Sequence, residues 1–478
     1  MPHIELKLRV PPHDLAKLRD HFFAAGFCES AIAERLGLWD ISLLNAKQLP
    51  HYIWLCQQEK STLSTLILVF LLRQGVKRAD LNKALTAEGI STLSLCGALQ
   101  RKSGLYYGTV SLFPCLGKFF FTDHWVSCGT QDLGHVYELG TDSYSLARLT
   151  CRSGYSSALD LCTGSGVHAI HSAADGLQST AVDINPKALR YTQINAALNS
   201  VAVETYEGDL YEALPSATYD LITVNPPFVP TPDRTVLIHR SPGESGEEVS
   251  ERLVRGLPER LNPNGMFSMI LNYPKLKSES YLDRIQRWLD QKTGWVIAVL
   301  DLKEMPIGQY IQEQISPVDD YGAEFCSYLE SYASQGIEAI LLGNVFLIRT
   351  GDDRPNHLVQ RKTVWPNISR QENLRAWLQA QLEYSAPHWH PSSDWKPAMN
   401  PYYKTLWRDR DQSKGILEPQ PDNWIPGEEL NGQQAELLSR LRGEETVLEL
   451  KNRWLEDGRS ERDFLQTLRE LGLLFALH

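Results

Sequence analysis

The stretch LDLCTGSG, residues 159–166, decides the fold class, because a short apolar segment runs directly into a turn that contains two glycines. A helix-like segment, VHAIHSAADG, follows at residues 167–176. Glycine permits a tight turn and a close approach to a ligand, and the start of a helix favours negative charge. The stretch therefore predicts a strand–turn–helix unit that binds a nucleotide-like ligand. A tight turn without a ligand is the structural alternative.

Short apolar segments alternate with amphipathic helices on both sides of this stretch, from about residue 134 to residue 350. The expected strands are 157–162, 179–184, 219–225, 265–273, 295–302 and 338–350. Alternation of this kind is typical of a doubly wound, mainly parallel sheet in an α/β fold.

The rest of the chain divides by its periodicity into further units. Residues 1–130 indicate a mostly helical N-terminal domain that ends in a β-hairpin, and residues 131–350 form the α/β core. Residues 351–430 are rich in proline and aromatic residues and predict an irregular arm. Residues 431–478 predict a helical module, for which a winged helix is one candidate form.

Composition narrows the function classes. The 478 residues carry a net charge of −11, which argues against a surface covered with phosphate-binding lysines but leaves room for a local basic face. The longest apolar run, residues 66–72, is far shorter than the ~20 residues of a membrane helix. We therefore expect a cytoplasmic protein without a membrane partner. The eight cysteines form no Cys-x-x-Cys pair, so we expect reduced core residues and no metal site.

Acidic residues at the ends of later segments extend the ligand site. Asp183 ends the segment AVD, one βα unit after the glycines, where a carboxylate can accept both hydroxyls of a ribose. Such a position suits NAD and S-adenosylmethionine equally. Asp209, followed by the apolar Leu210, is a candidate for the adenine ring, with a solvated turn as the alternative.

The tetrapeptide Asn225-Pro226-Pro227-Phe228 follows the strand expected at 219–225. The carboxyl ends of strands in an open α/β sheet are where ligands bind. A rigid turn with no chemical role is the alternative.

With these motifs in this order, residues 135–350 resemble the Asn/Asp-Pro-Pro-Tyr/Phe family of class I S-adenosylmethionine-dependent methyltransferases. The segments 138–147 and 239–249 also resemble segments of this family, and NPPFVPTPD is similar to its protein-glutamine branch. Phe228 stands where that branch usually has tyrosine, so the substrate class stays open. The resemblance implies a Rossmann-like sheet of seven strands and S-adenosylmethionine as cofactor.

The resemblance also implies the site residues. The cofactor-binding set is Asp160, Thr163, Gly164, Ser165, Gly166, Asp183, Ile184, Asn185, Asp209, Leu210 and Asn225, and the catalytic set is Asn225, Pro226, Pro227 and Phe228. The nitrogen of an amide or an aromatic amine is a poor nucleophile, because its lone pair is spread into a π system. If the Asn225 oxygen and the Pro226 carbonyl accept its hydrogens, the lone pair is directed at the methyl group. Phe228 can stack on the planar substrate group.

Other residues have simpler interpretations. Cys162 is expected to pack rather than act as a nucleophile, and His168 and His171 to face the helix surface or the cofactor. The aromatic residues of the arm, Trp395, Tyr402, Tyr403 and Trp407, are expected to pack, with a substrate clamp as the alternative. The acidic run Glu244, Glu247, Glu248 and Glu251 is expected to be a solvated helix start.

Three classes of function remain open from the sequence. The first, which the NPPFVPTP context and the acidic charge favour, is methylation of a protein or peptide amide, with a small-molecule amine as a variant. The second is methylation of an RNA or DNA base. The third is a NAD-binding or non-catalytic Rossmann protein. The oligomeric state is not predicted.

Overall fold

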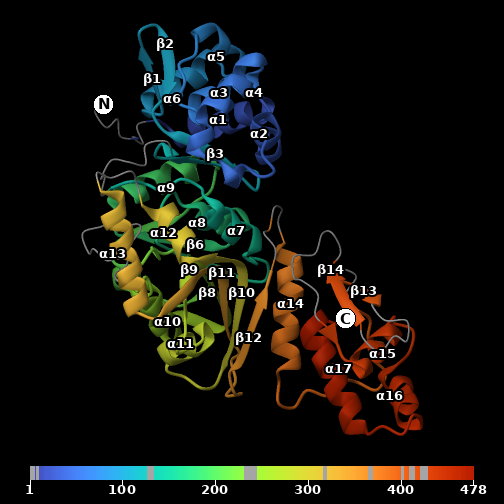
Figure 1. Ribbon diagram of the computed structural model, residues 1–478. Coiled ribbons are helices and arrows are strands. Elements are labelled where there is room, and N and C mark those ends of the chain that lie inside the picture. Colours follow the sequence, from blue (N-terminus) through green and yellow to red (C-terminus); the bar gives the residue numbers. More distant parts are fainter. Residues whose placement is uncertain are drawn as a thin grey trace.

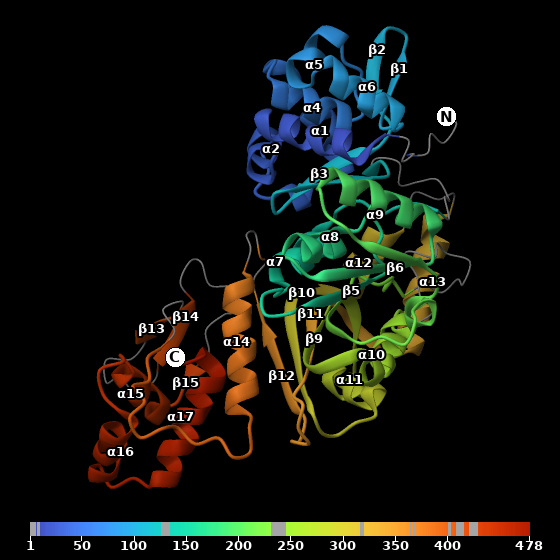
Figure 2. The same cartoon turned by 180° about the vertical axis from the view of Figure 1, so that it is seen from behind.

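A computed structural model of the protein describes residues 6, 10–125, 134–230, 245–315, 320–363, 366, 370–399, 403–407, 415–419 and 429–478, with the backbone alone at 403–407, 415–419 and 429. Figures 1 and 2 show three parts in a row: an N-terminal helical part, a central α/β part, and a C-terminal helical part beside helix α14.

The described residues of the N-terminal part form six helices and two β-hairpins around one apolar core. Its elements are α1 (Pro12–Ala24), α2 (Glu29–Leu36), η1 (Ile41–Leu43), η2 (Ala46–Gln48), α3 (Leu49–Gln58), α4 (Thr62–Phe70), α5 (Arg78–Ala84), α6 (Ala87–Leu95), β1 (Leu99–Lys102), β2 (Leu105–Gly108), β3 (Ser111–Cys115) and β4 (Lys118–Thr122). Hairpin β3–β4 forms where two aromatic runs flank a turn. This part continues into the central part through α9, because Asn195 and Asn199 accept hydrogen bonds from the backbone of β4.

The central sheet confirms the predicted α/β fold, with strand order β12-β10-β11-β9-β8-β5-β6-β7. Its strands are β5 (Ser157–Leu161), β6 (Gln178–Asp183), β7 (Glu204–Glu207), β8 (Tyr219–Val224), β9 (Leu261–Leu276), β10 (Trp295–Pro306), β11 (Ile337–Arg349) and β12 (His357–Lys362). Strand β11 runs antiparallel to β9 and β10, and the other neighbours pair in parallel. Counted over the described residues, the sheet has eight strands rather than the expected seven, because β12 adds to the edge at β10.

Helices cover both faces of this sheet, as a doubly wound sheet requires. They are α7 (Thr141–Leu149), α8 (Val167–Ala174), α9 (Pro186–Leu198), η4 (Leu210–Ala213), α10 (Glu248–Arg260), α11 (Tyr281–Leu289), α12 (Ile307–Gln314), α13 (Tyr321–Ser334) and α14 (Gln371–Tyr384). Helices α10 and α11 bury one face, while α7 and α14 bury the other. Because both faces are covered, most strands read as continuous apolar runs, which is why they were predictable.

The expectation of an irregular arm at residues 351–430 is wrong for part of this segment, because it contains regular secondary structure. Strand β12 and helix α14 lie within it, and α14 buries Leu374 and Trp377 against the sheet. The other side of α14 packs against the C-terminal helices, where Gln381 donates a hydrogen bond to the Leu473 carbonyl over 2.7 Å. The segment therefore joins the core to the C-terminal part, and α14 lies between β12 and α17 in both views (Figures 1 and 2).

The C-terminal part is helical, with a small antiparallel sheet before the helices in the chain. Its elements are β13 (Tyr403–Trp407), β14 (Gly415–Pro419), β15 (Glu429–Leu430), α15 (Gly432–Arg440), α16 (Val447–Glu456) and α17 (Glu461–Phe475). Capping boxes at Asn431 and Thr446 start the first two helices, as their sequences favour. The winged-helix form stays a prediction. Among the described residues, no helix is both long enough and apolar enough to cross a membrane.

Candidate active site

Three adjacent strands bring the predicted motifs to one edge of the sheet. In the order β8-β5-β6 the strands are parallel, so their carboxyl ends lie together. The glycine turn follows β5, Asp183 ends β6, and Asn225 follows β8. Residues that are far apart in the sequence thus form one candidate site.

Side chains from neighbouring elements hold the glycine turn by hydrogen bonds to the backbone of the turn. Gly164 N donates to Asp183 Oδ2 over 2.8 Å, and the Gly164 carbonyl accepts from Thr192 Oγ1. The Ser165 carbonyl accepts from Asn195 Nδ2 over 2.8 Å. The turn is therefore fixed before any ligand arrives.

The two glycines of the turn have different surroundings. Both adopt positive φ, +56° at Gly164 and +84° at Gly166. A Cβ at Gly166 would lie 2.8 Å from Thr192, whereas a Cβ at Gly164 would meet no atom within 4 Å. Gly166 is thus needed for packing, and Gly164 leaves free space that a ligand can approach.

Asp160 supports the turn from below rather than facing the site. It is 1% exposed, and its carboxylate accepts hydrogen bonds from Thr163 Oγ1, Thr223 Oγ1 and Ala169 N. Burial raises the pKa of Asp160 to about 7, against those hydrogen bonds. The side chain of Thr163 is engaged in the same contact, and Ser165 is buried as well. These predicted cofactor-binding residues act, in this geometry, through the shape of the turn.

Asp183, by contrast, lies half-buried at the surface of the site. Its Oδ1 accepts from Asn185 N over 2.9 Å, which leaves further lone pairs on both oxygens for hydroxyl donors. Burial raises its pKa, and backbone N–H donors oppose that rise. The side chain of Ile184 is 52% exposed beside it and offers an apolar surface for a flat ring. This pair suits a ribose and its base.

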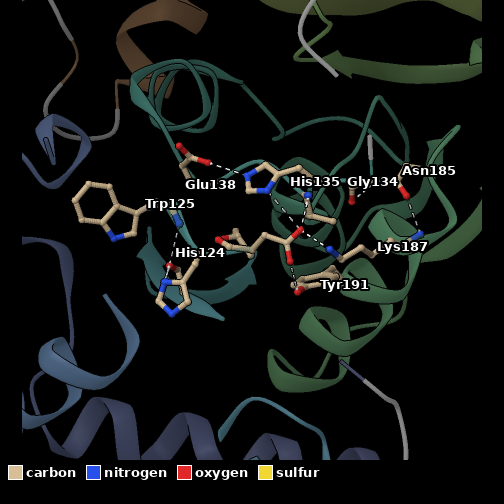
Figure 3. A network of polar contacts seen from close by, with 12 residues as sticks. His124, Trp125, Gly134, His135, Glu138, Asn185, Lys187 and Tyr191 are labelled. Atoms are coloured by element: carbon tan, nitrogen blue, oxygen red, sulfur yellow. Dashed lines mark hydrogen bonds and ion pairs between the residues drawn. The ribbon is translucent and has the colours of Figure 1, made fainter. Parts of the chain in front are cut away.

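A polar network connects the start of α9 to the N-terminal part (Figure 3). The Asp123 carboxylate accepts from Lys187 Nζ over 2.6 Å and from Tyr191 Oη over 2.8 Å. His135 lies between the same carboxylate, at 3.7 Å, and Glu138, at 3.4 Å. The side chain of Asn185 also donates to the Gly134 carbonyl over 3.2 Å. The start of α9, next to Asp183, is therefore anchored to the end of hairpin β3–β4.

Asp209 is paired with an arginine of the same chain. Its carboxylate forms an exposed ion pair with Arg252 Nη2 over 2.9 Å, and Arg252 also reaches Glu212. Leu210 is buried with a φ of +50°. Leu210 packs in the core of the sheet, so its role beside the adenine ring stays a prediction. Asp209 would have to exchange Arg252 for an adenine amine.

The NPPF motif is held at both ends. Asn225 is half-buried, and its Nδ2 donates to Asp142 Oδ2 over 2.9 Å, with Ser143 Oγ at 3.4 Å. Beyond Phe228, the Pro230 carbonyl accepts from Tyr332 Oη of α13 over 2.9 Å. Pro226 is buried, whereas Pro227 and Phe228 are half-buried.

The alternative residues of the sequence do not form a second site. Burial raises the pKa of the Cys162 thiol, which opposes a role as nucleophile. His168 and His171 are 3% and 4% exposed, so the expected place on the helix surface is wrong for both. No group of residues that could hold a metal ion occurs in the described parts of the chain.

Glu248 and Glu251 lie in the first turn of α10 and reach solvent, as expected for a solvated helix start, but Glu247 needs a correction. Glu247 is buried and pairs with Arg284, itself 2% exposed, over 3.1 Å, so it is not a solvated helix start. Burial raises the pKa of Glu247 to about 7. Trp395 packs against the C-terminal core, as expected. Some predicted residues lie outside the described part of the chain: Glu244, Tyr402, the side chains of Tyr403 and Trp407, and residues 231–233 and 239–243.

Sequence reasoning missed the contacts that orient the site. Asp142 lies in the segment 138–147, whose resemblance to the family was noted without a role for this residue. Thr192 and Asn195 of α9 hold the glycine turn, but they lie inside an ordinary helix. A small polar residue on the inward face of a helix beside a ligand turn is the signal that could have found them.

Comparison with known protein families matches this central part. The methyltransferase small domain matches residues 145–293. Methyltransferase HEMK2 of Homo sapiens is 31% identical over 170 residues, which are 32% of this chain and 79% of that protein. The ribosomal protein uL3 glutamine methyltransferase of Bradyrhizobium diazoefficiens is 29% identical over 235 residues, 44% of this chain and 73% of that protein.

A third relative matches over a shorter region. The release factor glutamine methyltransferase of Deinococcus radiodurans is 35% identical over 135 residues, 25% of this chain and 48% of that protein. The family match covers the glycine turn and the strands around it. The chain belongs to the methyltransferase small-domain family of S-adenosylmethionine-dependent methyltransferases.

Proposed function

We propose that the protein transfers a methyl group from S-adenosylmethionine to the side-chain amide nitrogen of a glutamine in a protein or peptide. The observation that carries this proposal is the half-buried amide of Asn225, which lies at the same sheet edge as the glycine turn and Asp183. Two of the relatives are named glutamine methyltransferases, which supports the same substrate. The net charge of −11 favours a protein over a nucleic acid.

The residues of the site fit the cofactor. The free space at Gly164 admits a close ligand, the Asp183 carboxylate can accept the ribose hydroxyls, and Ile184 can pack on the adenine. When bound there, S-adenosylmethionine supplies a methyl group made electrophilic by its sulfonium. The predicted residues Gly164, Asp183, Ile184 and Leu210 would hold it.

The chain's own part in the reaction is to bind and aim the substrate nitrogen. Asn225 Oδ1 and the Pro226 carbonyl accept the two N–H groups of the amide, so that the nitrogen lone pair points away from both. The ring of Phe228 stacks on the planar amide, and the two prolines keep the acceptors in place. The amide nitrogen held in this way would attack the methyl group that the cofactor supplies, with the cofactor's thioether as the leaving group, and would release one proton to water.

The test is transfer of isotope-labelled methyl from S-adenosylmethionine into an extract of methyl-starved cells, followed by protease, nuclease and size filtration. We expect label that is lost to protease and that mass spectrometry places on glutamine. Asn225→Ala should lower transfer by about a hundredfold or more while cofactor affinity stays within about threefold. Asp183→Asn should instead weaken cofactor binding by about tenfold or more.

Other outcomes would overturn the proposal. Label lost to nuclease would assign a nucleic-acid base, and label in the filtrate would assign a small-molecule amine. Full methyl transfer by Asn225→Ala would rule out a mechanism in which Asn225 accepts a hydrogen bond from the substrate amide.

A further inference from the structure

The contact between Asn225 and Asp142 joins the NPPF motif to a helix 83 residues earlier in the chain. Asn225 Nδ2 donates to Asp142 Oδ2 over 2.9 Å. Burial raises the pKa of Asp142, and the hydrogen bond from Asn225 opposes that rise. In this contact Asp142 Oδ2 is the acceptor, so the NH2 of the amide faces Asp142. Because the amide is planar, its Oδ1 then points away from Asp142. The Ser143 hydroxyl, at 3.4 Å from the same Nδ2, can also accept.

Asp142 is well placed to impose this orientation, because it cannot easily move. It is 6% exposed and lies in the first turn of α7, where the helix favours a negative charge. Gly140 leaves room for it, since a Cβ at position 140 would lie 2.8 Å from Asp142 Oδ1.

Helix α7 is itself anchored on several sides. Tyr144 Oη donates to the Pro114 carbonyl of hairpin β3–β4 over 2.7 Å. Ser145 Oγ accepts from Asn344 of β11 over 3.1 Å. Arg148 pairs with Glu29 and Asp40 of the N-terminal part. The position of Asp142 is thus set by the packing of the N-terminal part against the sheet.

We infer that Asp142 is a positioning residue, which holds the Asn225 amide so that its oxygen, and not its NH2, is presented to the substrate nitrogen. This inference rests on the proposed function. With the oxygen outward, Asn225 accepts a substrate N–H, whereas a flipped amide would place two N–H groups against each other. Asp142 does not touch the reacting atoms and acts only through Asn225.

The first test compares Asp142→Ala, Asp142→Asn and the control Asp220→Asn. Asp220 is a hydrogen-bonded carboxylate at the opposite end of β8, so its loss removes a similar group away from the site. We expect Asp142→Ala to lower kcat by about ten- to a hundredfold with KM and cofactor affinity within about threefold. Asp142→Asn should recover part of the loss, because an amide oxygen can still accept from Asn225.

A double variant separates positioning from a merely structural effect. If Asp142 acts through Asn225, Asp142→Ala in an Asn225→Ala background should change kcat by less than about twofold. A further loss as large as that of the single variant would overturn the inference, and so would full kcat in Asp142→Ala.

A readout without turnover keeps this inference distinct from the proposed function. In protein labelled with ¹⁵N-asparagine, the side-chain NH2 signals that vanish in Asn225→Ala identify Asn225. They should shift in Asp142→Ala and stay in place in Asp220→Asn. Unshifted signals would overturn the inference even if the enzyme methylates glutamine, while absence of methyl transfer by the natural protein would overturn the proposed function alone.

Discussion

At the scale of the residue, Asp160 is the group whose burial has the clearest consequence for stability. Its pKa is raised from 3.8 to about 7 by desolvation, so the folded protein holds this proton more tightly than the unfolded chain. The contribution of Asp160 to stability is therefore fully present below about pH 4 and is lost as the pH rises to about 7.

We predict that Asp160→Asn removes this pH dependence. The free energy of unfolding of the natural protein, relative to that of Asp160→Asn, should fall by up to about 4 kcal/mol between pH 4 and pH 7, from about three pKa units at 1.36 kcal/mol each. Urea unfolding of both proteins at several pH values measures the difference. The comparison also cancels Glu247, whose pKa is raised to about the same value. Equal slopes for the two proteins would show that Asp160 is ionised throughout.

At the scale of the element, the turn after β5 contains two glycines with different roles. Gly166 packs against Thr192, and Gly164 faces the free space of the site. Both glycines have positive φ, so alanine at either position is strained by about 1–2 kcal/mol. At Gly166 the new methyl group would also lie 2.8 Å from the Thr192 side chain and 3.1 Å from its Cα.

We predict that Gly166→Ala lowers the free energy of unfolding by about 2–4 kcal/mol, because overpacking adds to the strain. Gly164→Ala should cost about 1–2 kcal/mol and instead weaken S-adenosylmethionine binding, since its methyl group enters the free space of the site. Urea unfolding and calorimetric titration of the two variants measure these effects. If both variants lost stability equally, the contact with Thr192 would be too soft to matter.

The elements also differ in how well the sequence predicted them. Strands β5, β6, β8, β9, β10 and β11 were all expected near their observed bounds, because strands buried on both faces are continuous apolar runs. Strand β7, Glu204–Glu207, has the sequence ETYE and was missed, because an edge strand is paired on one side only and keeps polar side chains. Helix α14, QENLRAWLQAQLEY, contains no proline and was missed because the segment 351–430 was interpreted as a whole.

At the scale of the whole molecule, one buried arginine connects the parts of the chain. Arg148 is 1% exposed, and its guanidinium binds Asp40 over 2.9 Å, Glu29 over 2.8 Å and the Pro366 carbonyl over 3.0 Å. It therefore fastens α7 to the N-terminal part and to the segment before α14.

We predict that Arg148→Met lowers the free energy of unfolding by about 3–5 kcal/mol, because two carboxylates lose their buried partner. Arg255→Met is the matched control, since its pair with Glu251 is exposed and should contribute less than about 1 kcal/mol. Urea unfolding gives both values, and limited proteolysis should cut Arg148→Met between the N-terminal part and the core. An equal, small loss in both variants would mean that the parts are joined by apolar packing alone.

Sequence by itself determined the class of the core and the motifs at its strand ends. These depend on local features, which are apolar runs, glycine turns, Asp183 at the end of one strand and Asn225 directly after another. The placement of Asp142 against Asn225, the burial of Glu247 beside Arg284, and the addition of β12 to the sheet were decided only by the tertiary structure. Each of these depends on strand order and helix packing, which bring together residues far apart in the chain. No local pattern specifies which distant residue will satisfy a buried polar group.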